Sequence, residues 1–247
     1  PQAKGYAEAD PTSDIEGYDA ARKLAILASI AFNSRVTLDD VYVQGITGIT
    51  ATDIAYASEL KYVIKLLAIA KETAEGIEVR VHPAFIPNNH PLASVNGVFN
   101  AIFVKGDAVG EAMFYGQGAG ELPTASAVAG DIMTAARSIV LGTPQFLGCT
   151  CYEEKTIKKM DLTESKYYIR LHVSDRPGVL ASIAYAFGDK EVSIASVIQK
   201  QTDGTAAEIV LVTHKVKEKN LQDALKMIRH LSSVGSISSF IRVEGED

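Results

Sequence analysis

The chain has 247 residues, of which 47% are hydrophobic and 22% charged, and its formal net charge is −6 at pH 7. This is enough sequence for one large domain or two ordinary ones, with a composition that can bury a core without disulfides or metals. The acidic balance argues against nucleic acid or an anionic membrane as partner, and no apolar run reaches the ~18 residues of a membrane-spanning helix.

The first 150 residues mix helical patterns with strands and Gly-rich turns. Runs rich in Ala and Leu, with apolar residues at helical spacing, alternate with segments in which apolar and polar residues alternate singly. Gly106-Asp107 is a turn signal between two apolar stretches. These patterns predict helices over 19–32, 53–73 and 124–140, and strands over 77–85, 98–105 and 109–115.

The last third of the chain has a shorter and more regular pattern. It predicts the order βαββαβ, with strands over 167–173, 192–199, 206–213 and 236–243 and helices from the turn at 175–178 to about Phe187 and over 218–231. A polar, charge-dense stretch separates the two parts. We therefore predict two α+β domains, residues 1–150 and 166–247, joined by a linker at 151–165.

Cys149 and Cys151 are the only cysteines. A Cys-x-Cys pair rarely forms a disulfide, so reduced thiols are expected. The N-terminus lacks the basic and apolar regions of a signal peptide, and a cytoplasmic location is expected.

A charged cluster near the N-terminus is the first candidate site. Residues 5–23 contain several carboxylates and Lys23, and Asp19 and Lys23 are spaced i, i+4 on one helix face. By spacing alone, a capped helix with a surface ion pair is the simpler interpretation. The alternative is a polar amino-acid pocket, in which a carboxylate such as Glu8 holds an ammonium and Lys23 transfers a proton.

The same segment resembles the signature of homoserine dehydrogenases, Gly-Tyr-x-Glu-x-Asp-Pro-x-x-Asp-[Ile/Leu]-x-Gly-x-Asp-x-x-x-Lys, which is matched at every position from Gly5 to Lys23. This resemblance implies an enzyme that interconverts L-aspartate 4-semialdehyde and L-homoserine with NAD(P)H, in threonine and methionine biosynthesis. The cofactor supplies the hydride, and a proton donor or positive charge at the substrate oxygen stabilises the alkoxide.

The resemblance also implies roles for individual residues. Glu8 would bind the substrate ammonium, with Tyr6 beside it. Asp14 and Asp19 would line the reacting end of the substrate. Lys23 would act at the substrate oxygen as proton donor or relay, which makes Lys23 and Asp19 the expected catalytic residues.

A Gly-rich stretch at 116–124 is the second candidate. Its G-x-G-x-G spacing is not that of a dinucleotide-binding loop, and a tight strand-to-helix turn is the simpler interpretation. The stretch also resembles the homoserine dehydrogenase loop that closes the crevice under the nicotinamide. By that resemblance Gly118, Ala119, Gly120 and Thr124 are expected near the cofactor.

His82 and His90 could suggest a metal. They are separated by seven residues, with no Cys or third His nearby, so the usual ligand spacings are not met. We expect no metal site.

The βαββαβ part resembles an ACT domain, a small ligand-sensing module common on enzymes of amino-acid biosynthesis. The resemblance places an effector near the turn at 175–180, and threonine, the pathway end product, is the expected effector. A module that only mediates association is the alternative. The expected effector-binding residues are Asp175, Arg176, Pro177, Gly178, Val179, Leu180, Ser193, Ser196 and Gln199.

The family resemblance covers residues 5 to about 243. In that family a Rossmann-like domain precedes this region and supplies the phosphate loop, and nothing before Gly5 can supply one. We therefore expect these residues alone to be inactive and to hold no NAD(P), and we expect a homodimer or higher homo-oligomer. A catalytically inactive amino-acid sensor or scaffold is the alternative function.

Overall fold

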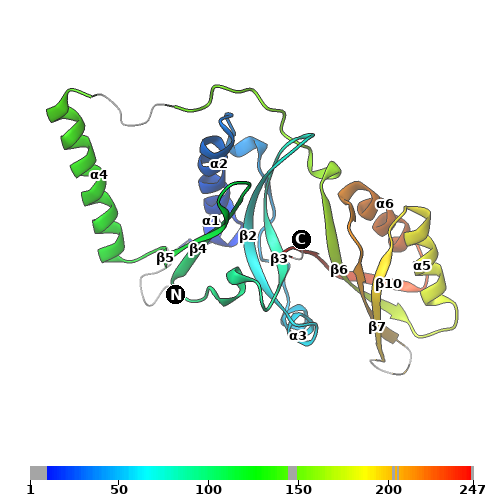
Figure 1. Ribbon diagram of the computed structural model, residues 1–247. Helices are drawn as coiled ribbons and strands as arrows, with labels where there is room; N and C mark the ends of the chain where they lie inside the picture. The colour runs from blue at the N-terminus through cyan, green and yellow to red at the C-terminus, as the bar shows by residue number, and fades with distance from the viewer. Residues whose placement is uncertain (1–9, 144–148, 202–203, 205, 246–247) are drawn as a thin grey trace.

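One mixed sheet runs through both halves of the chain (Figure 1). The computed structural model describes residues 10–143, 149–201, 204 and 206–245. Within these residues the sheet has eight strands in the order β1-β3-β10-β6-β8-β7, with β2 added on β3 and β9 on β6. The strands are β1 (Tyr42–Val43), β2 (Tyr62–Thr73), β3 (Gly76–Pro87), β6 (Glu164–Ser174), β7 (Ile194–Gln201), β8 (Ala206–Thr213), β9 (Val216–Lys217) and β10 (Val234–Val243).

Helices cover both faces of this sheet. In the first half, α2 (Tyr18–Phe32), which follows the short α1 (Thr12–Ile15), packs Ala21, Leu24 and Ala28 on Ile77 and Val81 of β3. The helix α3 (Ala51–Glu59) packs Tyr56 and Ala57 on Phe85 and Tyr168. Successive side chains of a strand point to opposite faces of the sheet. Both α2 and α3 contact odd-numbered residues of β3, so the two helices lie on the same face.

The second half is the predicted βαββαβ module. Its helices, α5 (Val179–Asp189) and α6 (Glu218–Arg229), pack on one face of β6, β8 and β10 around Ile169, Leu171, Ile183, Phe187 and Leu225. Each of these five residues is fully buried. The α+β fold class and the ferredoxin-like order are thereby confirmed.

The last strand joins the two halves, which the sequence did not predict. β10 is antiparallel to β6 inside the module and also parallel to β3, with Arg242 opposite Ala84 and Val243 opposite Phe85. The C-terminal end of β10 therefore lies beside β3 (Figure 1). The residues predicted as a linker also lie against this junction, because Lys158 forms ion pairs with Glu75 and Glu78.

The predicted helix over 53–73 is wrong. The helix ends at Glu59, Lys61 has a φ of 65°, and residues 62–73 form β2, which is antiparallel to β3 over its whole length. The apolar run from Val63 to Ala70 fits helical and strand periods equally well, so pattern alone could not decide between them. A left-handed residue such as Lys61 stops a helix, and pairing with β3 then decides for a strand.

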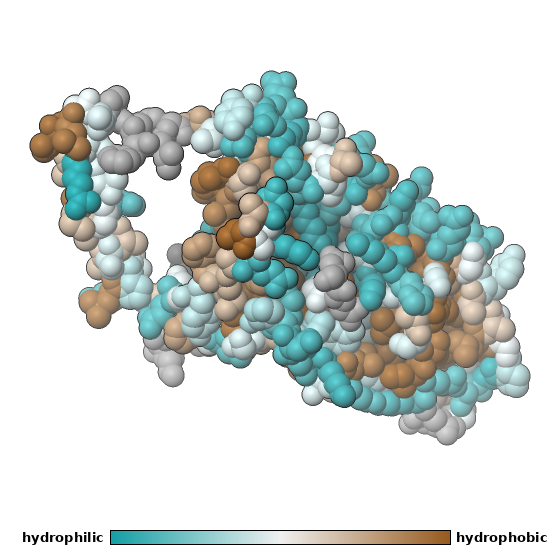
Figure 2. Space-filling view, viewed as in Figure 1, coloured by the Kyte–Doolittle hydropathy of each residue, from teal (hydrophilic) through white to brown (hydrophobic). Residues whose placement is uncertain are grey.

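A hairpin and a long helix stand apart from the sheet. The strands β4 (Phe99–Gly106) and β5 (Gly110–Gln117) form a separate two-stranded sheet, and α4 (Glu121–Leu141) follows it. No residue of α4 is buried. Even its apolar side chains Leu122, Ile139 and Val140 are at least 80% exposed. Figure 2 shows apolar surface at both ends of α4, and Figure 1 shows the helix separate from the other elements.

Candidate functional site

The N-terminal candidate residues lie where α1 turns into α2. Asp10 accepts hydrogen bonds from the backbone N–H (3.0 Å) and the hydroxyl (2.6 Å) of Thr12, which start α1. Gly17 caps α2 with a φ of 82°, and a Cβ there would lie 3.0 Å from Val81 Cγ1. Only glycine satisfies both this left-handed backbone and the close approach to β3, so the turn is fixed against the sheet.

Asp19 and Lys23 form the ion pair that their spacing predicts. Lys23 Nζ lies 2.6 Å from Asp19 Oδ2, and the side chains are 68% and 43% exposed, respectively. Asp14, in α1, is exposed. Tyr6 and Glu8 lie outside the described residues. The described part of the segment thus presents an exposed lysine and two carboxylates, a set that could bind a small polar substrate and move a proton.

The Gly-rich stretch connects β5 to α4, as expected for a strand-to-helix turn. Gly118 and Ala119 lie in the connection, Gly120 caps α4, and Thr124 is in the first turn, where its N–H donates to Gly120 O at 3.1 Å. Because α4 begins at Glu121, it starts three residues earlier than the sequence predicted. Pro123 is compatible with this earlier start. It lacks a backbone N–H, but the N–H groups in the first turn of a helix have no intrahelical acceptor.

Asn100 on β4 is a residue of this region to which the sequence gave no role. A Cβ at Gly118 would overlap the side-chain amide of Asn100, so any larger residue there would displace the exposed Asn100 side chain. Gly118 is also tied to the hairpin through its N–H, which donates to Val98 O at 3.1 Å. The register of the hairpin, which places Asn100 opposite Gly116, is the signal that could have found this contact.

The structure brings the two parts of the expected effector set together. Gln199 Nε2 on β7 donates to Asp175 Oδ1 at 3.3 Å, which links the turn before α5 to the neighbouring strand. Gly178 caps α5 with a φ of 87°, so the first N–H groups of α5 point into the turn. Val179 is buried in the module core, and the remaining residues of the set are exposed: Asp175, Arg176, Pro177, Gly178, Leu180, Ser193, Ser196 and Gln199.

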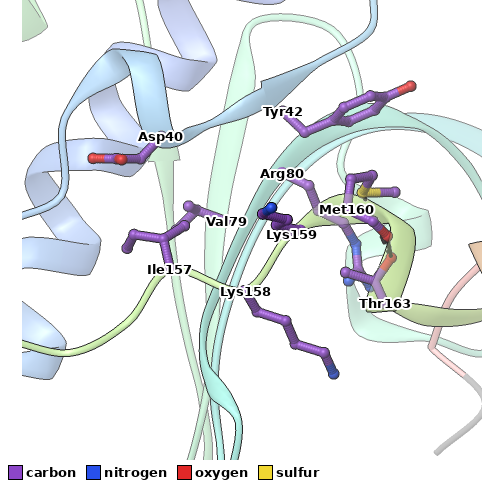
Figure 3. A pocket seen from close by; sticks show the side chains of 9 residues that line it. All are labelled: Asp40, Tyr42, Val79, Arg80, Ile157, Lys158, Lys159, Met160 and Thr163. Atoms are coloured by element: carbon purple, nitrogen blue, oxygen red, sulfur yellow. Dashed lines mark hydrogen bonds between the residues drawn. The ribbon is translucent and has the colours of Figure 1, made fainter.

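A cavity of about 160 Å³ lies elsewhere, at the junction between β1, β3 and residues 157–163 (Figure 3). None of the predicted site residues lines it. Two of its cations are already paired, because Arg80 contacts Glu78 (2.6 Å) and Glu244 (2.9 Å) and Lys158 contacts Glu78 (2.9 Å). Its lining is Asp40, Tyr42, Val79, Arg80, Ile157, Lys158, Lys159, Met160 and Thr163.

Beside this cavity His82 is completely buried and neutral. Its Nε2 accepts from Arg80 Nε at 3.2 Å, which leaves Nδ1–H to donate to Pro83 O at 3.0 Å. Burial, together with the positive charges of Arg242 and Arg80, lowers the pKa of His82 well below its usual value. His82 is thus structural, and His90 accepts from Leu92 N at 3.1 Å at the start of a short 3₁₀ turn.

Two further searches were confined to the described residues. They contain no group of three or more His, Cys, Asp or Glu side chains placed to hold a metal ion. Among their helices, none is both long and apolar enough to cross a membrane.

Fold and site together define a two-part protein, in which a mixed-sheet domain with a polar helix-turn site is joined to a βαββαβ module. The first part matches the family model for homoserine dehydrogenase over residues 1–133, and the second matches the ACT domain over residues 167–229. The chain belongs to the homoserine dehydrogenase family and carries an ACT domain.

Similar proteins support this assignment along the whole chain. A homoserine dehydrogenase of Mycobacterium tuberculosis is 48% identical over 98% of this chain, and one of Corynebacterium glutamicum is 47% identical over 97%. The crystal structure of a homoserine dehydrogenase from Thiobacillus denitrificans superposes with a TM-score of 0.91 at 42% identity over 99% of this chain. The Staphylococcus aureus enzyme at pH 7.5 gives 0.69 at 34% identity.

The chain spans little more than half the length of these relatives. It covers 57% of the M. tuberculosis protein, 55% of the C. glutamicum protein and 57% of the T. denitrificans chain.

Proposed function

We propose that this chain carries the substrate-binding and regulatory parts of an NAD(P)-dependent homoserine dehydrogenase, which interconverts L-aspartate 4-semialdehyde and L-homoserine in the cytoplasm. The observation that carries the proposal is the Asp19–Lys23 ion pair of 2.6 Å at the start of α2, which directly follows α1 with its exposed Asp14. A proton donor and two carboxylates are the groups that binding and reducing a small amino acid with an oxygen at its reacting end would require, and this supports the proposal.

Lys23 is the proton donor in this proposal. When hydride reaches the aldehyde carbon, the substrate oxygen becomes an alkoxide, and the Lys23 ammonium donates a proton to that oxygen. In the direction of homoserine oxidation the same nitrogen accepts the hydroxyl proton. Asp19 forms an ion pair with the Lys23 ammonium and so orients this exposed side chain.

The remaining carboxylates bind and orient the substrate. Glu8 holds the ammonium of the amino acid, Tyr6 lies beside it, and Asp14 orients the reacting end. Binding a small zwitterion at several points fixes its carbon for attack, which is worth several kcal/mol of the barrier in reactions of this kind.

We propose that Gly118, Ala119, Gly120 and Thr124 form one wall of the nicotinamide site. Two of these four residues are glycines, so little side chain stands between this wall and a cofactor, and at the end of β5 a Cβ at Gly116 would meet no atom within 4 Å. When bound, the cofactor supplies the hydride. No dinucleotide-binding motif occurs in this sequence, so we propose that these 247 residues alone neither bind NAD(P) tightly nor turn over homoserine.

The βαββαβ module is proposed to bind L-threonine at the Asp175–Gln199 pair and to reduce activity when it does. Its helix start provides N–H groups for a carboxylate, and the exposed carboxylate of Asp175 provides an acceptor for an ammonium. We further propose that the protein acts as a homodimer or higher homo-oligomer.

A chimera tests the catalytic part of this proposal. Joining this chain to the region that precedes the match in the M. tuberculosis relative should give NAD(P)⁺-dependent oxidation of L-homoserine, followed as absorbance of the reduced cofactor. Lys23→Ala in the chimera should lower kcat by about 10²–10⁴-fold, because the proton donor is lost. Lys226→Ala, which breaks an exposed pair with Asp223 on α6, is the matched control.

Two outcomes would count against the proposal. Full activity in Lys23→Ala would remove the lysine from the mechanism. A correctly folded chimera that binds L-threonine but never oxidises homoserine would favour the sensor or scaffold.

A further inference from the structure

The regulatory module reaches into the other half of the chain with one arginine. Arg170 on β6 is 8% exposed, and its guanidinium donates to three partners: Asp53 Oδ1 (3.0 Å), Glu208 Oε2 (2.9 Å) and Thr50 Oγ1 (3.1 Å). Asp53 and Thr50 belong to the start of α3, whereas Glu208 belongs to β8 of the module. A single side chain therefore connects the two halves through charge-assisted hydrogen bonds.

Asp53 is held firmly by this arrangement. It is completely buried, and its carboxylate also accepts from the backbone N–H (3.0 Å) and hydroxyl (2.7 Å) of Thr50. Burial alone would raise the pKa of Asp53, but the hydrogen bonds from Thr50 and Arg170 outweigh burial and lower it. Thr50 and Asp53 form a complete capping box at the start of α3, and Arg170 of the module adds a hydrogen bond to each of them from outside the helix.

The loop before Thr50 leads directly to the candidate substrate segment. Ile49 N–H donates to Ile46 O at 3.0 Å, which closes the loop, and Ile46 N–H donates to Ile15 O at 2.9 Å, which fixes the loop to α1. Gly45 is pressed against the same segment, since a Cβ there would lie 2.7 Å from both Glu16 Cα and Ile15 O. Thr50, which accepts a hydrogen bond from Arg170, is therefore connected by this short loop to Ile15, the residue next to Asp14.

The other end of the connection lies next to the expected effector residues. Lys200, which follows Gln199 on β7, pairs with Glu59 at 2.7 Å and lies 4.7 Å from the centre of the Tyr56 ring. Tyr56 in turn donates to Glu208 Oε1 at 2.6 Å. The strand β7, which carries Gln199, therefore contacts the C-terminal end of α3. Arg170 contacts the N-terminal end of the same helix.

We propose that Arg170 is a positioning residue for the substrate segment, and that α3 with the loop from Gly45 to Thr50 transmits effector occupancy at Asp175–Gln199 to residues 12–19. The physiological meaning of this inference rests on the proposed threonine regulation. Its structural claim concerns the ligand-free protein and can be tested separately. Coupling of this kind is carried by packed and hydrogen-bonded elements that two sites bias together.

Hydrogen exchange of the ligand-free chain is the first test. Arg170→Gln should speed exchange of the Glu16, Gly17 and Ile46 amides by about tenfold, since a charged hydrogen bond to the loop is lost. Arg229→Gln, at an exposed position on α6, is the matched control. If Arg170→Gln loses its circular-dichroism signal, Thr50→Val removes the contact between loop and guanidinium and is measured instead. Unchanged exchange at all three amides in a folded variant overturns the proposal.

L-Threonine is added in the second test. In the unmodified chain it should change exchange at Ile46 and residues 12–17. In Lys200→Met the threonine Kd, measured by calorimetry, should stay within about twofold while that change disappears. A change that persists in Lys200→Met overturns the route through α3. If L-threonine does not bind at all, it is not the effector. The hydrogen-exchange comparison of the ligand-free proteins still decides the role of Arg170.

Discussion

The ACT module and the hairpin–α4 region both contain large apolar side chains on their helices, but these side chains end in opposite states. In the module, α5 and α6 bury Ile183, Phe187 and Leu225 completely against the sheet. In the other region no residue of α4 is buried, and Ile132 and Ile139 are 63% and 80% exposed. Apolar content alone therefore does not form a core, because a helix also needs a second layer to cover it.

The difference separates residues that hold the fold from residues that are free for chemistry. The module closes its core with its own strands and helices, so its stability is local. The Gly116–Thr124 connection and α4 take no part in a core of the described residues, and substitutions there should leave the fold intact. This contrast can be measured.

The largest expected effect comes from truncating matched isoleucines in the two regions. Ile183→Ala in α5 should lower the free energy of unfolding by about 3 kcal/mol, because it leaves a cavity in a filled core. Ile132→Ala in α4 should change it by less than about 0.5 kcal/mol, because the side chain is already exposed. Urea titrations of both variants give the two values. Equal losses would mean that α4 is packed in solution, and the contrast would fail.

A medium effect is expected at the junction of the halves, from the buried His82. Its pKa in the folded protein is depressed by burial and by the cations Arg242 and Arg80, whereas in the unfolded chain it is near 6.5. Below that pH the unfolded state binds a proton that the folded state does not. The free energy of unfolding should therefore fall by about 1.4 kcal/mol per pH unit as the pH drops below 6.5.

His82→Gln separates this effect from general acid unfolding. Glutamine can still accept from Arg80 and donate to Pro83 O, but it does not titrate. Between pH 6.5 and 5, the slope of the unfolding free energy against pH should be smaller in this variant by the contribution of one proton. Urea titrations at several pH values measure this slope. His214→Gln, at an exposed position, controls for removal of an imidazole. An unchanged slope would show that His82 does not titrate in this way.

The smallest effect on stability is expected at the Asp19–Lys23 pair. Asp19→Asn should lower the free energy of unfolding by no more than about 0.5 kcal/mol, because exposed i, i+4 pairs contribute little. In the chimera the same substitution should reduce kcat, since it removes the group that orients Lys23. A loss of stability well above that limit would place the pair among the structural contacts of the first region instead.

Much of the fold could be predicted from local sequence patterns. The i, i+4 spacing of Asp19 and Lys23 predicted their contact, and the alternation in residues 77–85 predicted β3. Turn signals and periodicity also gave the order βαββαβ. These features depend on neighbours within a few residues, which a sequence displays directly.

What the sequence could not give depends on distant pairs. The strand at 62–73 was decided by β3, and the parallel pairing of β10 with β3 has no local signal. The Arg170–Asp53 contact joins residues 117 positions apart. In the candidate site, Asp175 and Gln199 were expected near an effector only through resemblance to a family, and their contact was not predicted. The contact of Asn100 with Gly118 required the register of the hairpin.

The pairing of β10 with β3 also bears on how the chain is made. Arg242 and Ala84 are partners 158 positions apart (242 minus 84), and β10 is the last strand of the sequence. A pairing of such high contact order forms late and slowly, because a large loop must close before any contact is gained. On the ribosome β3 emerges long before its partner, so the edge of β3 at Ala84 and Phe85 stays unpaired on that side until β10 has been synthesised. A chain that stopped before β10 would leave β3 and β6 each with an uncovered strand edge, and therefore a tendency to aggregate.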